Sequence, residues 1–462
     1  MTTSAAPIEH WQQRLTELAA KHHVVGASLA ILAGEDTIKV ATGVLNTRTA
    51  TAATTESVFQ YGSITKVFTT TLAMQLVDEG LLDLDVPITA YLPEFRVDDE
   101  ALTAGLTTRH LMSHSSGLVG DFFPDTGRGE DNLERFVTLM SELTATHPLG
   151  ATMSYCNAGF TLLGRVIEVL RGKSWDEVLQ ERLLLPLGMD AAGTLPEQAL
   201  LWGAAVGHIT PPGAAEPMLT PQWGLMRNAG PAGTLHGRAA DLLAFAQLHL
   251  NDGLAPDGTR LLTSESAQAM RVPQVEVPDR WTLGSHWGLG WILIDWDGAK
   301  VFGHDGATLG QQAFLRVLPG SGERAPLAVA LTCNGGDMGS LYHAIFAEVF
   351  SEYAGVTMTP PLEPTGYQPE VDLGTYVGTY SRESMEYVIE PDGEGLRLVA
   401  RPSGVLATAL GATEMTGPMI PFERDVFLTT LPALPGFIPA VFYTIATGES
   451  FLHLGGRATP RT

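Results

Sequence analysis

Four prolines within thirteen residues, from Thr357 to Pro369, divide this chain into two parts of different character. Proline fixes φ and lacks a backbone N–H, so this segment is typical of a semi-rigid linker. The 462 residues also exceed the size, roughly 250–300 residues, at which a single hydrophobic core stops growing. We therefore predict a first domain over residues 1–356, a linker over 357–369 and a second domain over 370–462.

The part before the linker mixes helical and strand-like patterns. Apolar residues recur with helical spacing at Trp11–Lys21, Thr65–Asp78, Asn157–Leu170, Trp175–Leu184 and Ala239–Leu250. Strand-like segments occur at Ala27–Ala33, Thr37–Thr42, Trp287–Ile294, Lys300–Gly303, Gln312–Val317 and Leu327–Thr332. The mixture predicts an α/β (α+β) domain.

The part after the linker shows only short β segments separated by turns such as Pro391-Asp-Gly-Glu-Gly395. These segments are Tyr376–Tyr380, Glu386–Glu390, Leu396–Ala400, Val426–Thr430, Val441–Ala446 and Phe451–Leu454. Evenly spaced short strands favour a small all-β barrel or sandwich.

Charge and cysteine content exclude several classes of function. A net charge of −24 argues against binding nucleic acid or an anionic membrane surface. The two cysteines, Cys156 and Cys333, make neither a disulfide framework nor a metal cluster. The first residues have no basic and apolar leader pattern, and no long apolar run occurs. We expect a cytoplasmic protein.

The most chemically informative pair is Ser63 and Lys66, where an extended segment gives way to a predicted helix. Residues three apart lie on one face of a helix, with Cβ atoms about 5–6 Å apart. A neutral lysine in that position is able to act as general base for a serine nucleophile. The spacing alone also arises by chance, so the prediction depends on partners elsewhere in the chain.

Tyr155-Cys-Asn157 is the first candidate for a partner. A phenol and an amide two residues apart on an extended segment point the same way and can face one pocket. The alternative is a buried tyrosine followed by an asparagine helix cap.

A third element is usually an imidazole or amine on a strand, followed by glycine, which leaves the strand edge open to substrate. His304-Asp-Gly306, His286-Trp-Gly288 and His453-Leu-Gly455 all match this pattern. The pattern does not choose among them. His110 and His114 have the spacing of a metal pair, but no third ligand stands out, and we expect no metal.

An ordered series of motifs resembles the serine β-lactamase and penicillin-binding-protein superfamily, in its class C-like branch. The series is Ser63-Ile-Thr-Lys66, Thr107-Thr-Arg-His-Leu-Met-Ser-His-Ser-Ser-Gly-Leu118, Tyr155-Cys-Asn-Ala-Gly-Phe-Thr-Leu-Leu-Gly164, Pro186-Leu-Gly-Met189, Ala232-Gly-Thr-Leu235 and Trp287-Gly-Leu-Gly-Trp291. It covers roughly residues 10–355. The resemblance implies an antiparallel sheet flanked by helices together with an all-helical subdomain.

The resemblance also implies roles for individual residues. In this family the strand with Lys or His before glycine follows the Gly-Leu-Gly segment, which selects His304. Ser63 would attack an acyl carbonyl, Lys66 would take its proton, and Tyr155 would relay it to the leaving group.

The same resemblance implies supporting residues around these groups. His304 and Asn157 would orient Tyr155, and the backbone N–H groups of Ser63 and Ala307 would form the oxyanion hole. Gly306 would leave the strand edge open. Trp223 and Trp287 are candidates for lining the acyl pocket, although aromatic residues on strands more often pack in a core.

The C-terminal β module sharpens the resemblance to one branch. The architecture is similar to the stand-alone penicillin-binding-protein-type thioesterases of nonribosomal peptide synthesis, which carry a lipocalin-like domain. These enzymes take a peptide from a carrier protein's phosphopantetheine thioester and close it head to tail, usually with a D-residue at the acylating end. Arg457 would then reach over the site to bind substrate. No cofactor of the enzyme itself is implied.

Two other functions remain open from the sequence. A class C-like serine esterase or D-amino-acid-specific peptidase would share every one of these residues and would release linear acid. A non-catalytic binding protein is disfavoured, because Ser63, Lys66 and Tyr155 are all present.

Overall fold

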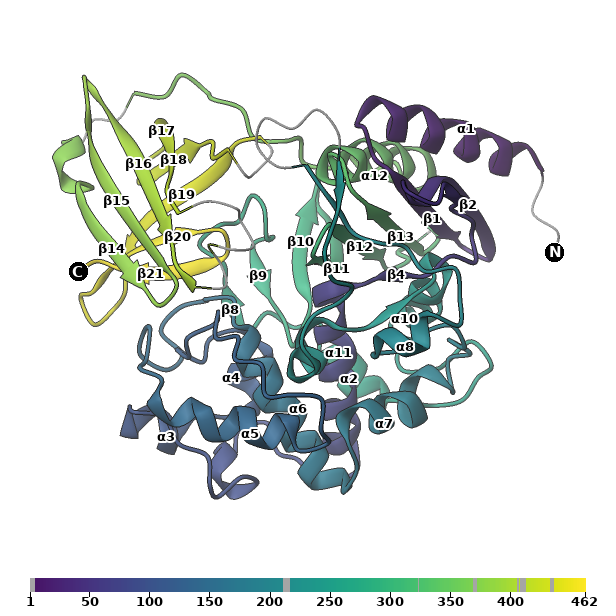
Figure 1. Cartoon of the computed structure of the whole chain (residues 1–462), viewed down its shortest axis with the longest axis horizontal. Helices are drawn as coiled ribbons and strands as arrows, with labels where there is room; N and C mark the ends of the chain where they lie inside the picture. The colour runs from purple at the N-terminus through teal and green to yellow at the C-terminus, as the bar shows by residue number, and fades with distance from the viewer. Residues whose placement is uncertain are drawn as a thin grey trace.

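The computed structural model describes residues 5–210, 217–322, 324–368, 372–404, 407, 413–432 and 436–462. Pro369 and residue 370, where the predicted linker meets the predicted second domain, lie outside these ranges. Residues 359–368 adopt neither helix nor strand. The chain on either side of them builds a large mixed domain and a smaller β-barrel (Figure 1).

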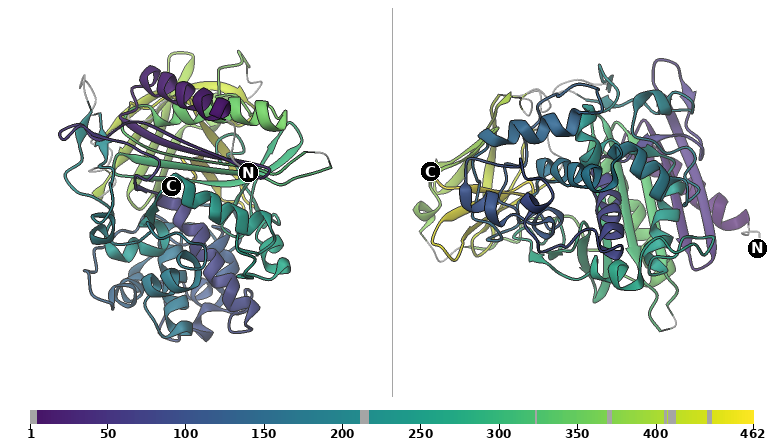
Figure 2. Two further views of the ribbon diagram at one scale, coloured as in Figure 1. Left: turned by 90° about the vertical axis from the view of Figure 1, so that its right-hand side faces the viewer. Right: turned by 90° about the horizontal axis from the view of Figure 1, so that it is seen from below.

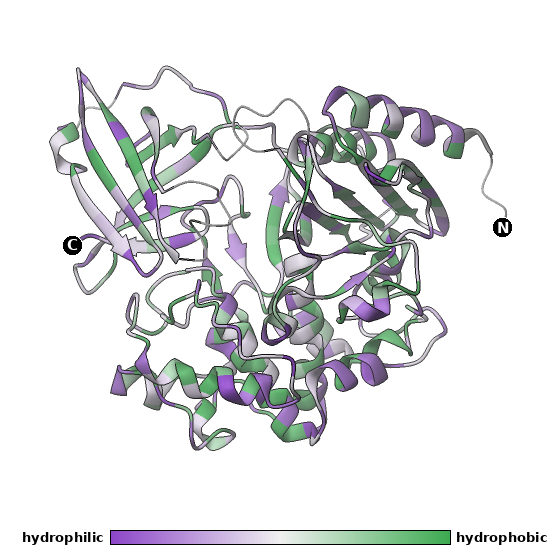
Figure 3. Cartoon of the chain, in the orientation of Figure 1, coloured by the Kyte–Doolittle hydropathy of each residue, from purple (hydrophilic) through white to green (hydrophobic). Residues whose placement is uncertain are grey.

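The large domain is built on a nine-stranded antiparallel sheet in the order β3-β2-β1-β13-β12-β11-β10-β9-β8. The strands are β1 (Gly26–Ala33), β2 (Asp36–Asn46), β3 (Thr51–Ala52), β8 (Val275–Glu276), β9 (His286–Trp287), β10 (Ile292–Trp296), β11 (Ala299–Thr308), β12 (Gln311–Leu318) and β13 (Leu327–Asn334). β1 pairs with β13, which sets Leu29 opposite Leu331 and joins the two ends of the domain. Every residue of β13 is buried, as expected for a strand covered on both faces, and the strand is largely hydrophobic (Figure 3).

Two helices from opposite ends of the domain cover one face of this sheet. They are α1 (Ala5–Lys21) and α12 (Met338–Ala354), which lie together above the sheet in Figure 2, left. Trp11 of α1 is fully buried, and its indole N–H donates to the Tyr353 hydroxyl of α12 at 3.0 Å. Burial of the apolar stripes of both helices against the sheet therefore closes this side of the core.

A helical subdomain covers the other face. Its helices are α2 (Thr65–Asp78), α3 (Glu100–Gly105), α4 (Thr108–Met112), α5 (Asn132–Leu139), α6 (Asn157–Arg171), α7 (Trp175–Leu179), α8 (Pro196–Ala199), α9 (Gly230–Gly233), α10 (Ala239–Leu250) and α11 (Ser264–Ala269). Two small sheets pair β4 (Phe59–Gln60) with β7 (His236–Gly237) and β5 (His208–Ile209) with β6 (Met218–Leu219). α2 is buried on nearly all sides, and Phe68 stacks on Phe245 of α10 at 3.6 Å between ring centroids.

The C-terminal domain is an antiparallel meander of eight strands in chain order. They are β14 (Gly378–Arg382), β15 (Met385–Asp392), β16 (Gly395–Pro402), β17 (Met415–Glu423), β18 (Val426–Thr429), β19 (Ile438–Thr444), β20 (Ser450–Leu454) and β21 (Arg457–Pro460). A bridge between Tyr380 and Arg461 brings the first and last strands together, so the sheet nearly closes into a barrel. The predicted fold class, a β-lactamase-like domain followed by a lipocalin-like barrel, is confirmed.

Side chains fill the barrel interior, including Tyr376, Tyr380, Tyr387, Phe427 and Phe442. Among the described residues, no helix combines the length and the apolar character needed to span a membrane.

Candidate active site

The candidate nucleophile and base lie at the entrance to α2. Ser63 sits in a short 3-10 turn, Gly62–Ile64, that runs directly into the helix and leaves the serine half-buried. The Lys66 Nζ lies 3.1 Å from the Ser63 Oγ and donates to the carbonyl oxygen of Ala232 at 2.6 Å. The structure therefore brings together the two side chains that the helical spacing predicted to meet.

Lys66 is completely buried, which governs its protonation. Burial lowers the pKa of Lys66 well below its ordinary value, and the nearby Arg457 charge lowers it further. A lysine in this environment is available as a neutral amine, the form that accepts a proton from a hydroxyl.

The carbonyl that anchors Lys66 belongs to α9, which is held in place from two sides. On one side, Thr69 donates to the neighbouring Pro231 carbonyl at 2.8 Å. On the other, a side chain at Gly164 of α6 would overlap the Pro231 ring, so the glycine permits close packing.

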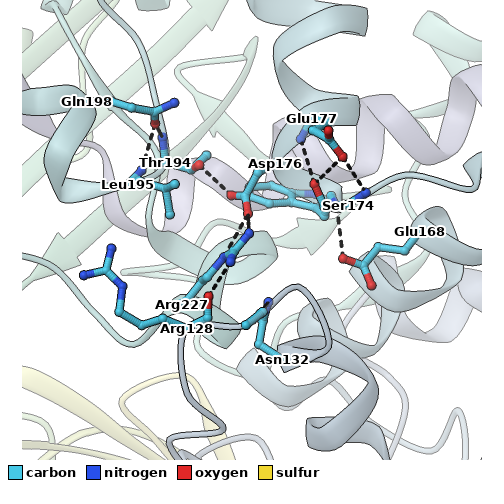
Figure 4. Close-up of polar contacts among 12 residues, drawn as sticks. Arg128, Asn132, Glu168, Ser174, Asp176, Glu177, Thr194, Leu195, Gln198 and Arg227 are labelled. Atoms are coloured by element: carbon cyan, nitrogen blue, oxygen red, sulfur yellow. Dashed lines mark hydrogen bonds and ion pairs between the residues drawn. The ribbon is translucent and has the colours of Figure 1, made fainter.

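A polar network fixes the segment that leads into α9 (Figure 4). Asp176 of α7 accepts a hydrogen bond from the Thr194 hydroxyl at 2.5 Å and pairs with Arg227 at 3.2 Å. Arg227 also donates to the backbone carbonyl of Arg128. The network therefore ties α7, the loop before α8 and the loop around Arg128 to the segment that positions Ala232.

Tyr155 lies two residues before the start of α6, with its ring among other aromatic groups. The Lys66 Nζ is 4.8 Å from the ring centroid, and the His114 ring is 4.3 Å away. Burial raises the pKa of Tyr155 well above its ordinary value, while the Ser63 hydroxyl and the Arg457 charge act in the opposite direction. The Tyr155 hydroxyl is buried without a well-formed hydrogen bond among the described residues, so its approach to Ser63 is looser than a hydrogen bond of good geometry.

His304 lies on β11 with its ring 6.2 Å from that of Tyr155. Its Nδ1 lies 2.6 Å from the Asp305 carbonyl oxygen. The proton is therefore on Nδ1, and Nε2 is left as the acceptor. Burial and the nearby Lys66 lower the pKa of His304 to about 3, so the imidazole is neutral at ordinary pH. The Asp305 carboxylate faces Arg316 and pairs with it at 2.6 and 3.0 Å.

Two backbone segments meet beside Ser63. Gly62 has φ +52°, and a Cβ there would lie 2.6 Å from the backbone nitrogen of Ala307. A Cβ on Gly306 would overlap the Tyr61 carbonyl and lie 2.9 Å from the Ser63 nitrogen. The backbone nitrogens of Ser63 and Ala307 are consequently close neighbours, as an oxyanion hole requires.

Asn157 and Arg457 meet at a buried carboxylate. Asn157 is the first residue of α6, and its Nδ2 lies 3.5 Å from the Oδ1 of Asp121. Arg457, from the barrel, donates to the same oxygen at 2.8 Å, and its guanidinium lies 4.9 Å from the Tyr155 ring centroid. Arg382, also from the barrel, donates to the other carboxylate oxygen at 2.8 Å.

Sequence reasoning missed Asp121, Arg382 and the position of His114. Burial alone would raise the pKa of Asp121, but the charges of Arg457 and Arg382 outweigh it and lower the pKa to about 2. The one signal in the sequence is an acidic residue directly after glycine in the loop that follows α4. Nothing comparable marks Arg382.

The two tryptophans have different surroundings. Trp287 is fully buried, with its ring 5.5 Å from His304 and 5.7 Å from Tyr155, so it supports these rings from behind. Trp223 is half-buried beside His236 and donates to the Ala205 carbonyl at 2.7 Å. Substrate contact by either tryptophan stays a prediction.

His110 and His114 do not face a common point. The Nδ1 of His110 lies 2.8 Å from the Thr107 hydroxyl, where it caps its own helix. His114 accepts a hydrogen bond from the Cys156 N–H at 3.0 Å. Within the described ranges, no three His, Cys, Asp or Glu side chains gather as metal ligands.

Comparison with known proteins agrees with this geometry. The sequence model of the β-lactamase family matches residues 11–348, and the chain therefore belongs to that family. Penicillin-binding protein 4 of Amycolatopsis lactamdurans is 45% identical over 376 residues, which cover 81% of this chain and 97% of that protein.

Solved structures extend the likeness to the whole chain. The structure of SurE superposes with a TM-score of 0.79 at 29% identity and covers 99% of this chain and 100% of SurE. A second SurE structure, with D-Leu, gives a TM-score of 0.76 at 28% identity with the same coverage. The predicted resemblance to the β-lactamase and penicillin-binding-protein superfamily is confirmed, and the chain shares its whole architecture, C-terminal barrel included, with SurE.

Proposed function

We propose that this protein is a serine acyltransferase that takes a peptidyl group from a carrier-protein thioester and releases it as a head-to-tail macrolactam. The observation that carries the proposal is the buried Lys66 amine 3.1 Å from the Ser63 hydroxyl, with the Tyr155 ring directly beside it, in surroundings that lower the pKa of Lys66. These groups supply a nucleophile, a base and a proton relay.

Acylation proceeds by exchange of a thioester for an ester. The Ser63 Oγ attacks the thioester carbonyl while its proton passes to Lys66, and the backbone N–H groups of Ser63 and Ala307 hold the oxyanion. The carbon–sulfur bond then breaks, and the proton reaches the leaving thiolate by way of Tyr155. The neutral His304 ring, 6.2 Å from the Tyr155 ring, helps to orient it.

Release reverses the proton transfers. The N-terminal amine of the bound peptide attacks the ester carbon, the carbon–nitrogen bond forms and the bond to the Ser63 Oγ breaks. The amine's proton returns to Ser63 through the same base. The product is a cyclic amide, and the enzyme regains its starting state.

Cyclisation rather than simple hydrolysis is supported by the match to SurE along the whole chain, barrel included. The D-Leu in one SurE structure supports a D-residue at the acylating end. The donor in this proposal is a carrier protein, with its phosphopantetheine arm as the thiol. A cytoplasmic location accords with such a donor.

The alternative is a serine esterase or D-amino-acid-specific peptidase in which water takes the place of the amine. A D-aminopeptidase of Brucella anthropi is 28% identical over 293 residues, which cover 62% of this chain and 52% of that protein. The same Ser63, Lys66 and Tyr155 would serve either reaction.

One experiment separates the two functions. The protein is incubated with linear peptidyl thioesters of a small thiol that end in a D-residue or in its L-epimer, and protein and product masses are followed. We expect an acyl adduct on the protein and a product that has lost the thiol without gaining water, with the D-ended substrate faster. Linear acid as the sole product would establish the hydrolase instead.

Two serine variants control this experiment. Ser63→Ala should abolish both the adduct and the product. Ser141→Ala, at an exposed serine of the helical subdomain, should change neither. An adduct that survives in Ser63→Ala would refute the assignment of the nucleophile.

A further inference from the structure

The barrel contacts the catalytic domain at the backbone of Tyr155 itself. The Tyr155 N–H donates to the Gly456 carbonyl, in the turn between β20 and β21, at 2.8 Å. Next to it, the Ala458 N–H donates to the Ser154 hydroxyl at 3.2 Å. A Cβ on Gly456, at φ +79°, would lie 3.0 Å from Leu283 and 3.7 Å from the Tyr155 Cβ, so this turn packs closely against Tyr155.

The same turn carries Arg457 onto the Tyr155 ring. Its guanidinium lies 4.9 Å from the ring centroid, and the Lys66 Nζ lies 4.8 Å from that centroid. One aromatic ring therefore has a barrel arginine and the candidate base as neighbours. The positive charge of Arg457 disfavours the protonated form of Lys66 and so lowers its pKa, an effect that is strongest where water is excluded.

Asp121 fixes the position of this arginine. Its side chain is 5% exposed, and it receives Arg457 on one oxygen and Arg382 on the other, each at 2.8 Å. Arg382 is itself 9% exposed. One carboxylate between two guanidinium groups leaves a net positive charge in a buried cluster beside Lys66.

Two hydrogen bonds hold the Arg457 guanidinium in place. One terminal nitrogen of Arg457 donates to Asp121 and the other to the Gly455 carbonyl at 3.0 Å. These bonds use two of its five N–H donors, and Nε is buried without a hydrogen-bond partner among the described residues. The guanidinium is therefore held against the Tyr155 ring, where its charge acts from a fixed position.

We infer that the barrel completes the catalytic centre, with Asp121 and Arg382 acting as positioning residues that hold Arg457 against Tyr155 and beside the general base Lys66. The inference rests on the proposed function, because it assigns these residues to acylation of Ser63. The alternative is that the ion pair between Arg457 and Asp121 only holds the barrel against the large domain. In that case its loss would lower stability and leave proton transfer to Lys66 unchanged.

The pH dependence of acylation distinguishes the two roles. The rate of Ser63 acylation by an activated ester is measured from pH 5 to pH 10 on full-length protein. In Arg457→Met we expect the acid limb of kcat/KM to move to higher pH by about one unit, with a roughly tenfold loss on the acid side. Loss of the arginine charge makes Lys66 easier to protonate, which gives the shift this sign.

Three further variants test the assignment. Arg457→Lys keeps a positive charge and should keep the acid limb close to that of the wild type. Arg382→Met leaves Asp121 with one partner and should shift the limb in the same direction as Arg457→Met, by less. Arg397→Met removes an exposed barrel ion pair with Glu390 and should leave the profile unchanged.

Each outcome bears on one claim. An unmoved acid limb in a folded Arg457→Met protein would overturn the inference, as would an Arg457→Lys profile identical to that of Arg457→Met. If Arg457→Met does not fold, Arg382→Met and Arg457→Lys carry the same comparison. If the wild type itself shows no acylation that depends on Ser63, the proposed function fails instead.

Discussion

A side chain on Gly306 would begin 2.9 Å from the backbone nitrogen of Ser63. Strand β11 therefore runs against the turn that carries the nucleophile with no space between them, and glycine is required by the close approach of two backbones. This contact places the backbone nitrogen of Ala307 beside that of Ser63. The spacing of the candidate oxyanion hole thus depends on a missing Cβ atom.

Gly306→Ala should separate β11 from the Ser63 turn. The added methyl would overlap the Tyr61 carbonyl, and backbone is less able to yield than a flexible side chain. Displacing one oxyanion donor costs roughly 10²–10³ in rate, so we expect acylation to fall by about that factor in a stopped-flow assay with an activated ester.

Gly339→Ala is the matched control for this variant. Gly339 lies in α12, and a Cβ there would meet no atom closer than 3.8 Å. Alanine is preferred over glycine in a helix by about 0.5–1 kcal/mol, so stability should rise slightly with activity unchanged. Normal acylation in Gly306→Ala would contradict the proposed oxyanion hole.

The acylation rate of the wild type should fall at acidic pH. Burial and Arg457 lower the pKa of Lys66 well below its ordinary value, so the amine is neutral over a wide range and becomes protonated only as the pH falls through that lowered value. A protonated Lys66 is unable to accept the proton of Ser63. The check is a pH profile of kcat/KM with one acid limb that tracks the lysine. Lys66→Met should lower the rate at every pH, and a rate that rises toward acid would contradict this base.

The buried carboxyl of Asp279 should make the fold less stable above about pH 6. Burial raises the pKa of Asp279 to about 6 despite hydrogen bonds from Thr282 and the Trp281 N–H. Because the folded state holds this proton more tightly than the unfolded chain, the stabilising effect is present below about pH 4 and is lost as the pH rises through 6. A shift of about two units corresponds to about 2–3 kcal/mol.

Asp279→Asn removes that titration, and its amide oxygen still accepts from the backbone N–H groups of Trp281 and Thr282, although the amide nitrogen does not accept the bond from the Thr282 hydroxyl. In urea unfolding, the free energy of unfolding of the variant minus that of the wild type should therefore be larger at pH 8 than at pH 5. If this difference is the same at pH 5 and at pH 8, Asp279 is already ionised at pH 5.

Asp176→Asn should loosen the network of Figure 4 and, through it, the anchor of Lys66. The substitution removes the charge that pairs with Arg227 at 3.2 Å. Removing one partner of a half-buried charged hydrogen bond costs about 1–3 kcal/mol. We expect a lower Tm and a several-fold slower acylation.

Glu197→Gln provides the comparison for Asp176→Asn. It breaks the ion pair of Glu197 with Arg128, in which both side chains are more than half exposed. Such pairs contribute about 0–1 kcal/mol, so Tm and acylation should hardly change. An equal loss in the two variants would mean that the network does not act through α9.

Several features of this protein follow from local sequence pattern. Apolar periodicity predicts a helix over Thr65–Asp78, and α2 has those bounds. The three-residue spacing brings Ser63 and Lys66 together because a helical turn fixes their distance within one short segment. Two strands of the barrel, β17 and β21, were not predicted. Both contain proline, and a proline in a sequence segment argues against predicting a strand there.

His304, His286 and His453 share one sequence pattern, and the order of the motifs selects His304. The structure agrees, because His304 is the one of the three that lies beside Tyr155 among the described contacts, while His453 is fully buried in the barrel. Other features exist only in three dimensions. Asp121 meets Arg382 across 261 positions of sequence.

The sequence by itself determined the candidate nucleophile, its candidate base, the choice of His304 and the family, because these depend on short spacings and on ordered motifs. Tertiary structure decided how the barrel reaches Tyr155, how Asp121 gathers its two arginines and why the pKa of Lys66 is lowered. The physical reason is that burial and charge at a buried site are set by what packs around it, and those neighbours come from distant parts of the chain.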